Sequence, residues 1–507
     1  MELNKIQDLL KEYKINNITD DSRKVKSCSI FMAYKGENLD RRKFIPELIK
    51  TNKLNNIIIF KDIDNFELHG LVEHIYESEK IIIITYYNLR ENLGLIAKEF
   101  YKNQDNYFDI SAVTGTNGKT SIVYLLTKSL ELLGQKTGYI GTLGINNNHQ
   151  EVINTTPGAI QLQKILSDFY KDEVKYINME ASSHALMQNR LSGIVFNTVI
   201  FTNLTPEHLD YHKDMGDYFS AKSKLFKKPY INNKTVIIIN HDDPYGIRLL
   251  QNLVEENYKN KIISYGSVEG TNKLSQICPG MSLLDYSYIA YDDSGIIFSE
   301  IKNKKFKLET NLIGKFNLYN LLAVVGDLYS KDFSIDNILK VIKQIKSIPG
   351  RMQQVENDRA RIYIDYAHTS DALESILKEL KILKEESNNN LQLICIFGCG
   401  GDRDKLKRPE MGKVAVKYAD KVIITDDNPR SENPELIIQD IVNGLTDEEY
   451  SKITINHNRL NAIKHALSLA NADDIIIIAG KGHEEYQIYG NDRVYYSDFA
   501  AVRALLD

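Results

Sequence analysis

The sequence predicts an α/β protein with largely parallel sheets. Short runs rich in β-branched residues alternate with helical stretches along the whole chain, which is the pattern of strand–helix–strand units. In one such unit a glycine-rich loop joins a strand to a helix, as in phosphate-binding proteins. The chain has 507 residues, which is too long for one hydrophobic core, and we therefore expect three domains.

The first block covers residues 1–100 and begins with an amphipathic helix in MELNKIQDLLKEYKI. Strands are expected at SIFMAYKG, NNIIIF and KIIIITY, because each is a short apolar run bounded by polar residues. The helix LRENLGLIAKEFY leads out of this block.

The second block, residues 101–346, opens with the strand FDISAV and the helix TSIVYLLTKSLELLG. Further strands are expected at YINMEAS, TVIFTNL and TVIIIN. The third block, residues 347–507, alternates helices with the strands RIYIDYA, LQLICIFG, DKVIITD and DDIIIIAG. This alternation is typical of a Rossmann-like, dinucleotide-binding-type sheet.

Composition narrows the class of protein. The 63 basic and 68 acidic residues leave a net charge of −5, so no nucleic-acid partner is expected. The apolar runs fall far short of the about 20 residues that a membrane span needs, and the amino terminus lacks the apolar core of a signal peptide. Four cysteines are too few for a disulfide framework. We expect a cytoplasmic monomer that acts on small molecules and does not insert into membranes.

The glycine-rich loop predicts a nucleotide site. It consists of Gly115, Thr116, Asn117, Gly118, Lys119 and Thr120. Backbone N–H groups at the start of the following helix face the phosphates, Lys119 reaches them, and the Thr120 hydroxyl binds Mg²⁺. The full phosphate-loop consensus has a further glycine five residues before Gly118, where this chain has Val113.

Two residues are candidates for further magnesium ligands. Glu180 and His208 each follow a predicted strand of the second block, and the loops after such strands carry ligands in α/β proteins. Either residue alone is more often a cap or a satisfied polar group. Together they indicate a metal site beside the phosphate loop.

Several motifs, in this order, resemble the Mur ligases, which are ATP-dependent amide-bond synthetases of peptidoglycan synthesis. They are GTNGKT (115–120), TTPG (155–158), EASSHAL (180–186), TNLTPEHLDYH (202–212), GKFNLYN (314–320), PGR (349–351) and DYAH (365–368). The resemblance implies an N-terminal UDP-sugar-binding domain (1–100), a central P-loop ATPase domain (101–346) and a C-terminal amino-acid-binding domain (347–507).

The resemblance also implies a mechanism and its residues. ATP phosphorylates a substrate carboxylate, and an amine attacks the acyl phosphate. Lys119, Lys222, Glu180 and His208 are the expected catalytic residues, and Thr120, Glu180, His208 and Lys222 are expected to serve Mg²⁺. Lys222 matches a lysine that is carbamylated to N6-carboxylysine in the family. Asn320, Arg351 and Asp365 match the contacts to adenine and ribose.

A nucleotide-sugar peptide is the expected acceptor. The residues that match its contacts are Ser22, Thr155, Thr156, Ser182 and Arg190. The chain departs from the family pattern in two places. Arg41 and Arg42 follow Asp40 where Gly and His are usual, and Gln353 stands where an acid commonly follows Arg-Met.

The motifs DSRKV, GCGGDRDKLKRPEMG, TDDNPR and GKGHEEYQ indicate which amine is added. They resemble ligases that join meso-2,6-diaminopimelate to UDP-N-acetylmuramoyl-L-alanyl-D-glutamate. Arg430 suits this substrate, because a guanidinium can clamp its distal carboxylate and would repel the bare ammonium of lysine. The matching amino-acid-binding residues are Arg408, Asp427, Asn428, Pro429, Arg430, Gly480 and Glu484.

Three alternatives remain at this point. In the first alternative, the ligase adds lysine or another diamino acid such as lanthionine. Arg430 suits lanthionine as well as diaminopimelate, because both end in the same carboxylated head. Folylpolyglutamate synthetase shares the phosphate loop, but it does not explain DSRKV or DNPR. A non-catalytic ATP-binding protein is expected to lack one of Glu180, His208 and Lys222, and all three are present.

Overall fold

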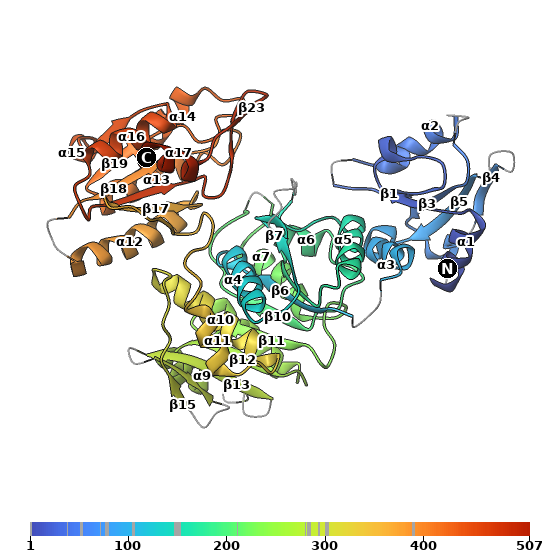
Figure 1. Cartoon of the computed structure of the whole chain (residues 1–507). Coiled ribbons are helices and arrows are strands. Elements are labelled where there is room, and N and C mark those ends of the chain that lie inside the picture. Colours follow the sequence, from blue (N-terminus) through green and yellow to red (C-terminus); the bar gives the residue numbers. More distant parts are fainter. Residues whose placement is uncertain are drawn as a thin grey trace. The chain divides into compact units, whose positions relative to one another are not determined.

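The computed structural model describes residues 3–37, 39–50, 54–70, 72–76, 81–103, 107–146, 154–209, 211–278, 280, 285–292, 295–299, 304–387 and 391–506. The fold is α/β, with three mixed or parallel sheets that follow one another along the chain (Figure 1). No helix in this described part is long and apolar enough to cross a membrane. The predicted fold class is confirmed.

The first sheet, blue in Figure 1, has the order β1-β2-β3-β5-β4 and is parallel except for β4. Its strands are β1 (Asn17–Thr19), β2 (Ser29–Ala33), β3 (Ile57–Ile63), β4 (Val72–Tyr76) and β5 (Ile81–Tyr87). Its helices are α1 (Leu3–Glu12), α2 (Ile45–Lys50) and α3 (Leu89–Tyr101). Side chains of α1 and α3 share a core with alternate residues of β2, β3 and β5, and Ile45 of α2 packs with the others, as period-two strands require.

The central sheet has ten strands in the order β15-β14-β13-β12-β11-β10-β6-β9-β7-β8. The strands are β6 (Asp109–Thr114), β7 (Thr137–Gly141), β8 (Gly144–Ile145), β9 (Tyr176–Glu180), β10 (Thr198–Phe201), β11 (Val236–Asn240), β12 (Ile262–Ser267), β13 (Tyr286–Asp292), β14 (Gly295–Phe298) and β15 (Lys304–Phe306). The seven neighbouring strands β13-β12-β11-β10-β6-β9-β7 pair in parallel. At the two edges of the sheet, β8, β14 and β15 pair antiparallel.

The helices that follow these strands are α4 (Lys119–Leu132), α5 (Ala159–Lys171), α6 (Ser183–Met187), α7 (Met215–Ser223), α8 (Pro244–Glu255), α9 (Val268–Ile277), α10 (Lys315–Ser330) and α11 (Ile335–Ile342). Residues of α5, α6, α7 and α8 share one core with β6, β9, β10 and β11. Helix α4 packs on β7 and β9. Because helices cover the parallel strands, these read as continuous apolar runs such as Ile237-Ile238-Ile239, all of which are buried.

The last sheet has the order β16-β17-β21-β18-β19-β20, parallel except for β16. The strands are β16 (Gln353–Val355), β17 (Arg361–Asp365), β18 (Leu393–Phe397), β19 (Lys421–Ile424), β20 (Ile453–Ile455) and β21 (Ile475–Ala479), followed by the hairpin β22 (Tyr486–Tyr489) and β23 (Asp492–Tyr495). The helices are α12 (Ser370–Ser387), α13 (Lys407–Tyr418), α14 (Pro434–Val442), α15 (Asp447–Tyr450), α16 (Arg459–Leu469) and α17 (Asp498–Leu506).

Alternation along β21 shows how this sheet is covered. Ile475 and Ile477 lie in one core with α12, α13 and α14, whereas Ile476 and Ile478 lie in another with α16 and α17. A buried ion pair joins the last two helices, because Arg459 Nε and Nη2 donate to the two carboxylate oxygens of Asp498 at 2.8 Å each. The layered arrangement agrees with the Rossmann-like sheet expected from the sequence.

Two glycines bring α3 against the central part of the chain. The Gly94 N–H donates to Ser192 Oγ at 2.9 Å, and a Cβ on Gly94 would lie 1.8 Å from the Ser192 carbonyl oxygen. Gly193, with φ +82°, would bring a Cβ within 2.9 Å of Gly94 carbonyl carbon. Only glycine permits this approach of two backbones.

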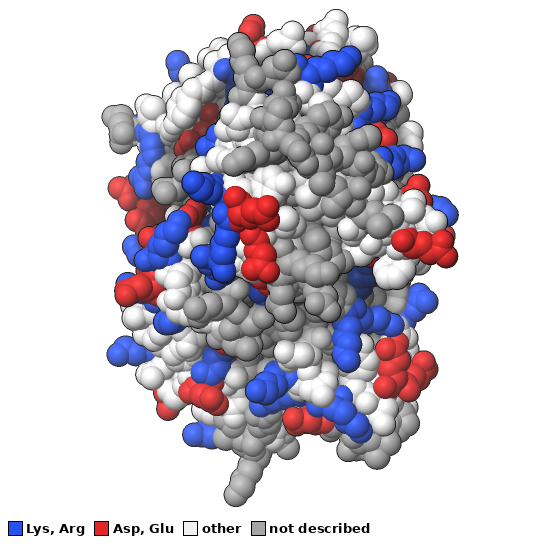
Figure 2. Space-filling model, turned by 90° about the vertical axis from the view of Figure 1, so that its right-hand side faces the viewer, with Lys and Arg blue, Asp and Glu red and all other residues white. Residues whose placement is uncertain are grey.

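The chain forms two compact units. One holds residues 1–308 and 319–342, and the other holds residues 309–318 and 343–507. The first unit therefore contains the first two sheets, and the second contains the last sheet and its hairpin. On the face shown in Figure 2, basic and acidic side chains are interspersed, in keeping with the near-balanced charge of the chain.

Candidate nucleotide and substrate sites

The phosphate loop lies at the carboxyl end of β6 and leads directly into α4. Gly115 has φ +148° and Gly118 has φ +89°, which are conformations that side chains with a Cβ rarely adopt. A Cβ on Gly115 would also lie 1.8 Å from Thr202 Oγ1. Both glycines are thus required by the backbone, and the first N–H groups of α4 remain available to an anion.

Val113, the departure from the usual loop, belongs to the sheet. It is buried and pairs with Glu180 of β9 on one side and Ile200 of β10 on the other. The strand runs on to Thr114, so the turn begins only at Gly115. A β-branched residue suits this interior position better than glycine.

The segment after β10 holds the loop from the side. Thr202 Oγ1 donates to the Asn117 carbonyl at 2.6 Å, and the Asn117 N–H donates to Asn203 Oδ1 at 2.9 Å. The Thr116 N–H donates to the Asn203 carbonyl at 2.9 Å. Sequence reasoning identified the motif TNLTPEHLDYH (202–212) by resemblance, but it did not recognise that Thr202 and Asn203 support the phosphate loop.

Two lysines converge on one carbonyl oxygen of the loop. Lys119 Nζ donates to the Gly115 oxygen at 2.9 Å and to the Thr116 oxygen at 2.7 Å. Lys222, the penultimate residue of α7, donates to the same Gly115 oxygen at 2.8 Å. Burial and the neighbouring Lys119 charge hold the pKa of Lys222 well below its usual range. A neutral amine here is a nucleophile towards CO₂.

Glu180 ends β9 and its side chain is fully buried. Its Oε1 accepts hydrogen bonds from the Thr142 N–H at 2.7 Å and from the Tyr139 hydroxyl at 3.2 Å. Its Oε2 is buried without a hydrogen-bond partner. An orphaned carboxylate oxygen beside a phosphate loop suits Mg²⁺, which prefers oxygen ligands.

His208 has φ +57°, and its ring packs edge-on against His184 with centroids 4.9 Å apart. The neighbouring His212 is buried, with Nε2 3.0 Å from Ser183 Oγ and Nδ1 3.4 Å from Asp217 Oδ2. Among the residues that the structure describes, no three His, Cys, Asp or Glu side chains form a metal-binding group. In the expected set of Thr120, Glu180, His208 and Lys222, only Glu180 and His208 are of these residue types.

The residues expected to bind adenine and ribose fall in both compact units. Asn320 of α10 lies against the phosphate loop, since a Cβ on Gly118 would meet its Oδ1 at 2.7 Å. In the other unit, Arg351 lies over the Tyr366 ring at 4.6 Å. Asp365 ends β17 and accepts from the N–H groups of Met352 and Ala367, at 2.7 Å each. Burial raises the pKa of Asp365, against the charge of Arg351.

Four of the five residues expected to bind the nucleotide-sugar peptide lie close together in the central part. Thr156 Oγ1 donates to the Glu180 carbonyl at 2.8 Å and accepts from the Ser182 N–H at 3.2 Å. Arg190 Nη1 donates to the Thr156 carbonyl at 3.0 Å, and Thr155 Oγ1 lies 3.4 Å from Thr142 Oγ1. This cluster therefore adjoins Glu180.

Glu37 and Gln188 connect this cluster to the first sheet. Arg190 Nε donates to Gln188 Oε1 at 2.8 Å, and Gln188 Nε2 donates to Glu37 Oε2 at 2.7 Å. The Tyr211 hydroxyl donates to Glu37 Oε1 at 2.9 Å. Sequence reasoning missed Glu37 and Gln188, because a single Glu and a single Gln carry no spacing signal.

Ser22 begins a short 3₁₀ helix (Ser22–Lys24) that Asp21 caps. The two arginines that depart from the family pattern lie in the same part of the chain. Arg41 Nε donates to the Asp20 carbonyl at 3.0 Å and its guanidinium lies over the Tyr34 ring, while Arg42 pairs with Asp40 through two bonds of 2.9 Å. Both arginines thus fasten loops of the first sheet.

Gln353, the other departure, holds the turn before β16. Its Oε1 accepts a hydrogen bond from the Gly350 N–H at 2.9 Å. A carboxylate at this position could accept the same bond, so the replacement keeps the local structure.

The candidate amino-acid site gathers at the carboxyl ends of β19 and β21. Asn428 Nδ2 donates to Glu484 Oε2 at 3.0 Å, and Lys481 Nζ lies 3.2 Å from both Asn428 Oδ1 and Glu484 Oε2. Sequence reasoning missed Lys481, which is fully buried. Gly480, with φ +109°, would place a Cβ 2.7 Å from Asp427 Oδ2. Burial raises the pKa of Glu484, against the Lys481 charge.

Arg430 takes a left-handed backbone conformation, with φ +54°, held by a bond from its N–H to the Ile488 carbonyl at 3.0 Å. Its Nη1 donates to the Gly401 carbonyl at 2.8 Å. A Cβ on Gly400 would lie 2.9 Å from Arg430 Nη1 and 3.7 Å from Arg403 Cγ, so two arginines flank Gly400. Sequence reasoning did not single out Arg403.

Arg408 does not have the exposure expected of a substrate contact. Its side chain is fully buried, and its Nη1 and Nη2 atoms donate to Glu432, Asp440 and the Gly400 carbonyl. The bond to Arg408 lowers the pKa of Glu432 to about 2. Arg408 therefore supports the loop at Gly400. Pro429 is also buried. Its backbone carbonyl packs against Gly401, because a Cβ on Gly401 would lie 1.9 Å from the Pro429 oxygen.

Comparison with known proteins agrees with this arrangement. The family model of the Mur ligase middle domain matches residues 113–327, and that of the Mur ligase glutamate ligase domain matches residues 350–482. A UDP-N-acetylmuramoyl-L-alanyl-D-glutamate--2,6-diaminopimelate ligase of Prochlorococcus marinus subsp. pastoris is 38% identical over 97% of this chain and 94% of its own length. A protein of the same name from Fusobacterium nucleatum subsp. nucleatum is also 38% identical, with the same coverage.

The solved structures extend the comparison. A UDP-N-acetylmuramoyl-L-alanyl-D-glutamate--2,6-diaminopimelate ligase aligns with a TM-score of 0.63 and 31% identity, over 97% of this chain and 95% of the other. A MurF ligase from Thermotoga maritima in complex with ADP aligns at 0.55, but its 16% identity speaks for the fold alone. With two matching family models and relatives that span nearly its whole length, this chain belongs to the Mur ligase family.

Proposed function

We propose that this chain is an ATP-dependent ligase that adds meso-2,6-diaminopimelate to UDP-N-acetylmuramoyl-L-alanyl-D-glutamate. The observation that carries the proposal is that Lys119 and Lys222 converge on one carbonyl oxygen of the phosphate loop. Beside the strand that leads into this loop, Glu180, which pairs with Val113, has a buried carboxylate oxygen without a partner. A phosphate loop alone suits any nucleotide-binding protein. A buried second lysine and an unsatisfied carboxylate beside it suit a site that handles metal ions and transfers the phosphoryl group.

The nucleotide is bound chiefly by backbone groups. The N–H groups at the start of α4 face the phosphates, and Lys119 leaves its loop carbonyls to contact the β- and γ-phosphates. Asn320, whose Oδ1 lies against Gly118, is proposed to contact the adenine. In the other unit, Arg351 and Asp365 are the residues proposed to bind the nucleotide. The Tyr366 ring and two backbone N–H groups orient these two side chains.

Magnesium would be held by the Thr120 hydroxyl, Glu180, His208 and Lys222. When bound, Mg²⁺ supplies charge neutralisation for the phosphates and the acyl phosphate. The neutral Lys222 amine reacts with CO₂ to give a carbamate and one proton, so a neutral group beside the loop becomes an anion. Glu180 contributes the carboxylate oxygen that has no protein partner.

The nucleotide-sugar peptide is proposed to lie along Ser22, Thr155, Thr156, Ser182 and Arg190. Arg190 is oriented by Gln188 and the Thr156 carbonyl, so its guanidinium has a defined direction for an anionic group of the substrate. Thr156 also bonds to the Glu180 backbone carbonyl, and this bond supports the proposal that the acceptor lies next to that carboxylate.

The incoming amino acid is proposed to bind at Asp427, Asn428, Pro429, Arg430, Gly480 and Glu484. Among the described residues Arg430 forms no ion pair with a carboxylate, and its side chain donates to the carbonyl oxygens of Gly401 and Asn428. Its remaining N–H groups suit the distal carboxylate of diaminopimelate, with Arg403 as the second cation beside Gly400. We propose Arg408 as a support of this loop, through Glu432 and Asp440.

Each of the three proposed domains has a main role in binding one of the substrates. We infer an N-terminal UDP-sugar-binding domain of residues 1–100, a central ATP-binding domain of residues 101–346 and a C-terminal domain of residues 347–507, each built on one of the three main sheets. We also propose that the protein works in the cytoplasm as a monomer without a nucleic-acid partner.

An amino-acid panel tests the proposal. The whole protein is incubated with ATP, Mg²⁺, UDP-N-acetylmuramoyl-L-alanyl-D-glutamate and one amine, and release of ADP is followed. We expect turnover with meso-2,6-diaminopimelate, and slower or equal turnover with lanthionine, which keeps the same distal head. Turnover with lysine and none with diaminopimelate would refute the specificity, and no amine-dependent ADP release at all would refute the ligase activity.

A further inference from the structure

Lys481 is a buried cation inside the candidate amino-acid site. It lies two residues after the end of β21, and its side chain is fully buried. Its Nζ lies 3.2 Å from Glu484 Oε2, 3.2 Å from Asn428 Oδ1 and 3.8 Å from Asp427 Oδ1. All four residues belong to the same compact unit. One ammonium group therefore lies within 4 Å of two carboxylates of the candidate site.

Asn428 fixes the direction of the Glu484 side chain. Its Oδ1 accepts a hydrogen bond from the Ile488 N–H at 3.1 Å. A backbone N–H can only donate, so this atom is the amide oxygen, and Nδ2 is left to donate to Glu484 Oε2 at 3.0 Å. Glu484 Oε2 thus accepts from both Asn428 and Lys481. Its Oε1 accepts no hydrogen bond from the residues that the structure describes, and this oxygen is left for a ligand.

The three charges of this cluster do not cancel. Asp427 and Glu484 carry two negative charges against the one positive charge of Lys481, so one negative charge remains. The Lys481 side chain is 0% exposed, whereas those of Asp427 and Glu484 are 10% and 16% exposed. A ligand can therefore reach the two carboxylates but not the Lys481 ammonium. A second ammonium group suits this place, because it would form charge-assisted hydrogen bonds with the carboxylates.

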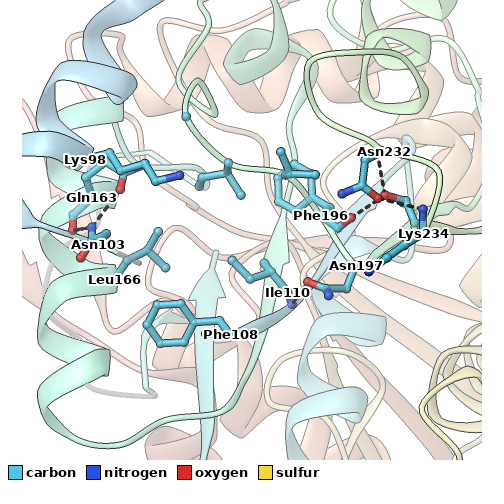
Figure 3. A pocket seen from close by; sticks show the side chains of 14 residues that line it. Lys98, Asn103, Phe108, Ile110, Gln163, Leu166, Phe196, Asn197, Asn232 and Lys234 are labelled. Atoms are coloured by element: carbon cyan, nitrogen blue, oxygen red, sulfur yellow. Dashed lines mark hydrogen bonds between the residues drawn. The ribbon is translucent and has the colours of Figure 1, made fainter. Parts of the chain in front are cut away.

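The cavity in Figure 3, which lies in the other compact unit, lacks such convergence. Its volume is about 90 Å³. Gln163 and Lys98 stand at one end and Asn232 and Lys234 at the other, with apolar side chains between them (Figure 3). A single small ligand would not meet both polar groups. The charged side chains of the amino-acid site, in contrast, surround one point.

Loss of Lys481 would change the charge of Glu484. Burial raises the pKa of Glu484, the Lys481 charge opposes this, and the Asp427 charge adds to it. Tyr366 and Tyr486 also face this carboxylate, and burial raises the pKa of both phenols, so they stay neutral near pH 7. A buried carboxyl beside another carboxylate, with no cation near it, takes up a proton. A protonated Glu484 would no longer attract an ammonium.

We propose that Lys481 is a positioning residue of the amino-acid site, which holds Asp427 and Glu484 together with one excess negative charge for an ammonium of the incoming diamino acid. It acts through the two carboxylates and does not touch the substrate. This inference rests on the proposed function, which assigns both carboxylates to amino-acid binding. The attacking amine needs a free lone pair, so the ammonium held here belongs to the amino group that does not react.

Steady-state kinetics on the whole protein, with the ADP-release assay, test the inference. Near pH 7, Lys481→Met should raise the KM for meso-2,6-diaminopimelate by about tenfold, the cost of one charged hydrogen bond, and leave the KM for ATP unchanged. Near pH 8.5 its KM for diaminopimelate should return towards that of the natural chain, because Glu484 loses its proton as the pH rises. Lys464→Met, which replaces an exposed lysine of α16, is the matched control and should keep both KM values.

The substrate analogue 2-aminopimelate locates the ammonium, since it lacks the distal amino group. The natural chain should prefer diaminopimelate to this analogue, and near pH 7 Lys481→Met should lose about tenfold of that preference. Lys481→Gln, which keeps a donor without the charge, should behave as Lys481→Met does and guards against a packing defect. Far-UV circular dichroism compares the folding of all variants. An unchanged preference in both Lys481 variants would overturn the inference.

Glu484→Gln separates positioning from a structural role. It should raise the KM for diaminopimelate as far as Lys481→Met does, without the pH dependence. The double variant should be no worse than Glu484→Gln alone, because Lys481 acts through Glu484. Additive effects, or a pH-independent rise in Lys481→Met, mean that Lys481 supports only the fold, and the inference fails.

Urea denaturation measures the same charge without catalysis. Between pH 5 and pH 8 the urea midpoint of Lys481→Met should fall as the pH rises, relative to that of the double variant. A carboxyl whose folded-state pKa is raised stabilises the fold fully below about pH 4.3, the unfolded value, and loses this contribution as the pH rises through the folded-state pKa. Equal midpoint profiles would overturn the inference. The expected profiles, in a chain that releases no ADP with any amine, would refute the proposed function and retain the effect of Lys481 on its carboxylates.

Discussion

Replacing Lys222 tests the electrostatics of the phosphate loop. Lys119 and Lys222 each place Nζ within 3 Å of the same Gly115 oxygen, so the two nitrogens are at most about 6 Å apart. Two positive charges at that distance repel by about 3 kcal/mol at an effective dielectric constant of about 20. Together with burial, this repulsion lowers the pKa of Lys222 and favours the neutral amine that CO₂ requires.

The magnitude expected for Lys222→Ala follows from the charge it removes. A metal ion that neutralises the transferring phosphoryl group is worth several kcal/mol, and each about 1.4 kcal/mol is tenfold in rate. We therefore expect kcat to fall by about three orders of magnitude. Lys222→Arg should fall as far, because a guanidinium stays charged and forms no carbamate. Short carboxylates should restore part of the activity of Lys222→Ala.

The assay combines ADP release with ¹³C NMR. The natural chain, equilibrated with ¹³C-bicarbonate, should show a carbamate resonance that Lys222→Ala lacks, and its activity should decline in CO₂-depleted buffer. Lys119→Ala separates charge repulsion from burial, since it removes the first and keeps the second. An active Lys222→Arg variant, or an active natural chain without a carbamate resonance, would refute the reasoning.

Three further predictions concern the C-terminal unit. Arg430→Ala should raise the KM for diaminopimelate far more than that for ATP in the ADP-release assay, with Arg361→Ala as the control. Equal effects on both KM values would count against the clamp. Asp498→Asn should lower the free energy of unfolding by about 3–5 kcal/mol, because it leaves the buried Arg459 charge unpaired. Urea denaturation measures this, and a loss below about 1 kcal/mol would contradict it. His457 lies 2.9 Å from two carboxylates, whose charges raise its pKa above the usual range. The stabilisation it contributes is complete below about pH 6.5, its value in the unfolded chain, and is lost as the pH rises through the folded-state pKa. His457→Asn should abolish that part of the pH dependence of unfolding, and an unchanged profile would exclude the ion pairs as its cause.

The elements with strong local signals were predictable from the sequence. Helix α3 begins and ends where its amphipathic pattern does, at residues 89 and 101, and the apolar runs of β11 and β21 lie in central positions of their sheets. The hairpin of β22 and β23 and the edge strands β14 and β15 were not identified, because their residues are mixed in polarity and several are exposed. Their strand conformation depends on pairing partners.

The candidate site divides in a similar way. The phosphate loop was predicted from its spacing. The roles of Glu180 and His208 were predicted from their places after strands and stay predictions. The partners that fix these groups come from distant parts of the chain, and no local pattern indicates them. Lys481 beside Glu484 is one case. The burial of Arg408 among carboxylates is another, since motif position alone suggests a substrate contact.

The close approach of Gly94 and Ser192 has a consequence for chimeric proteins. The first hundred residues of this chain invite exchange with those of a relative, because they have a sheet of their own. Yet a side chain of any size at position 94 would collide with a backbone carbonyl 98 residues further on. The smallest exchangeable module is therefore discontinuous. A graft that joins the two chains at residue 100 must keep glycine at position 94, or must also take the turn at residues 192–193 from the relative.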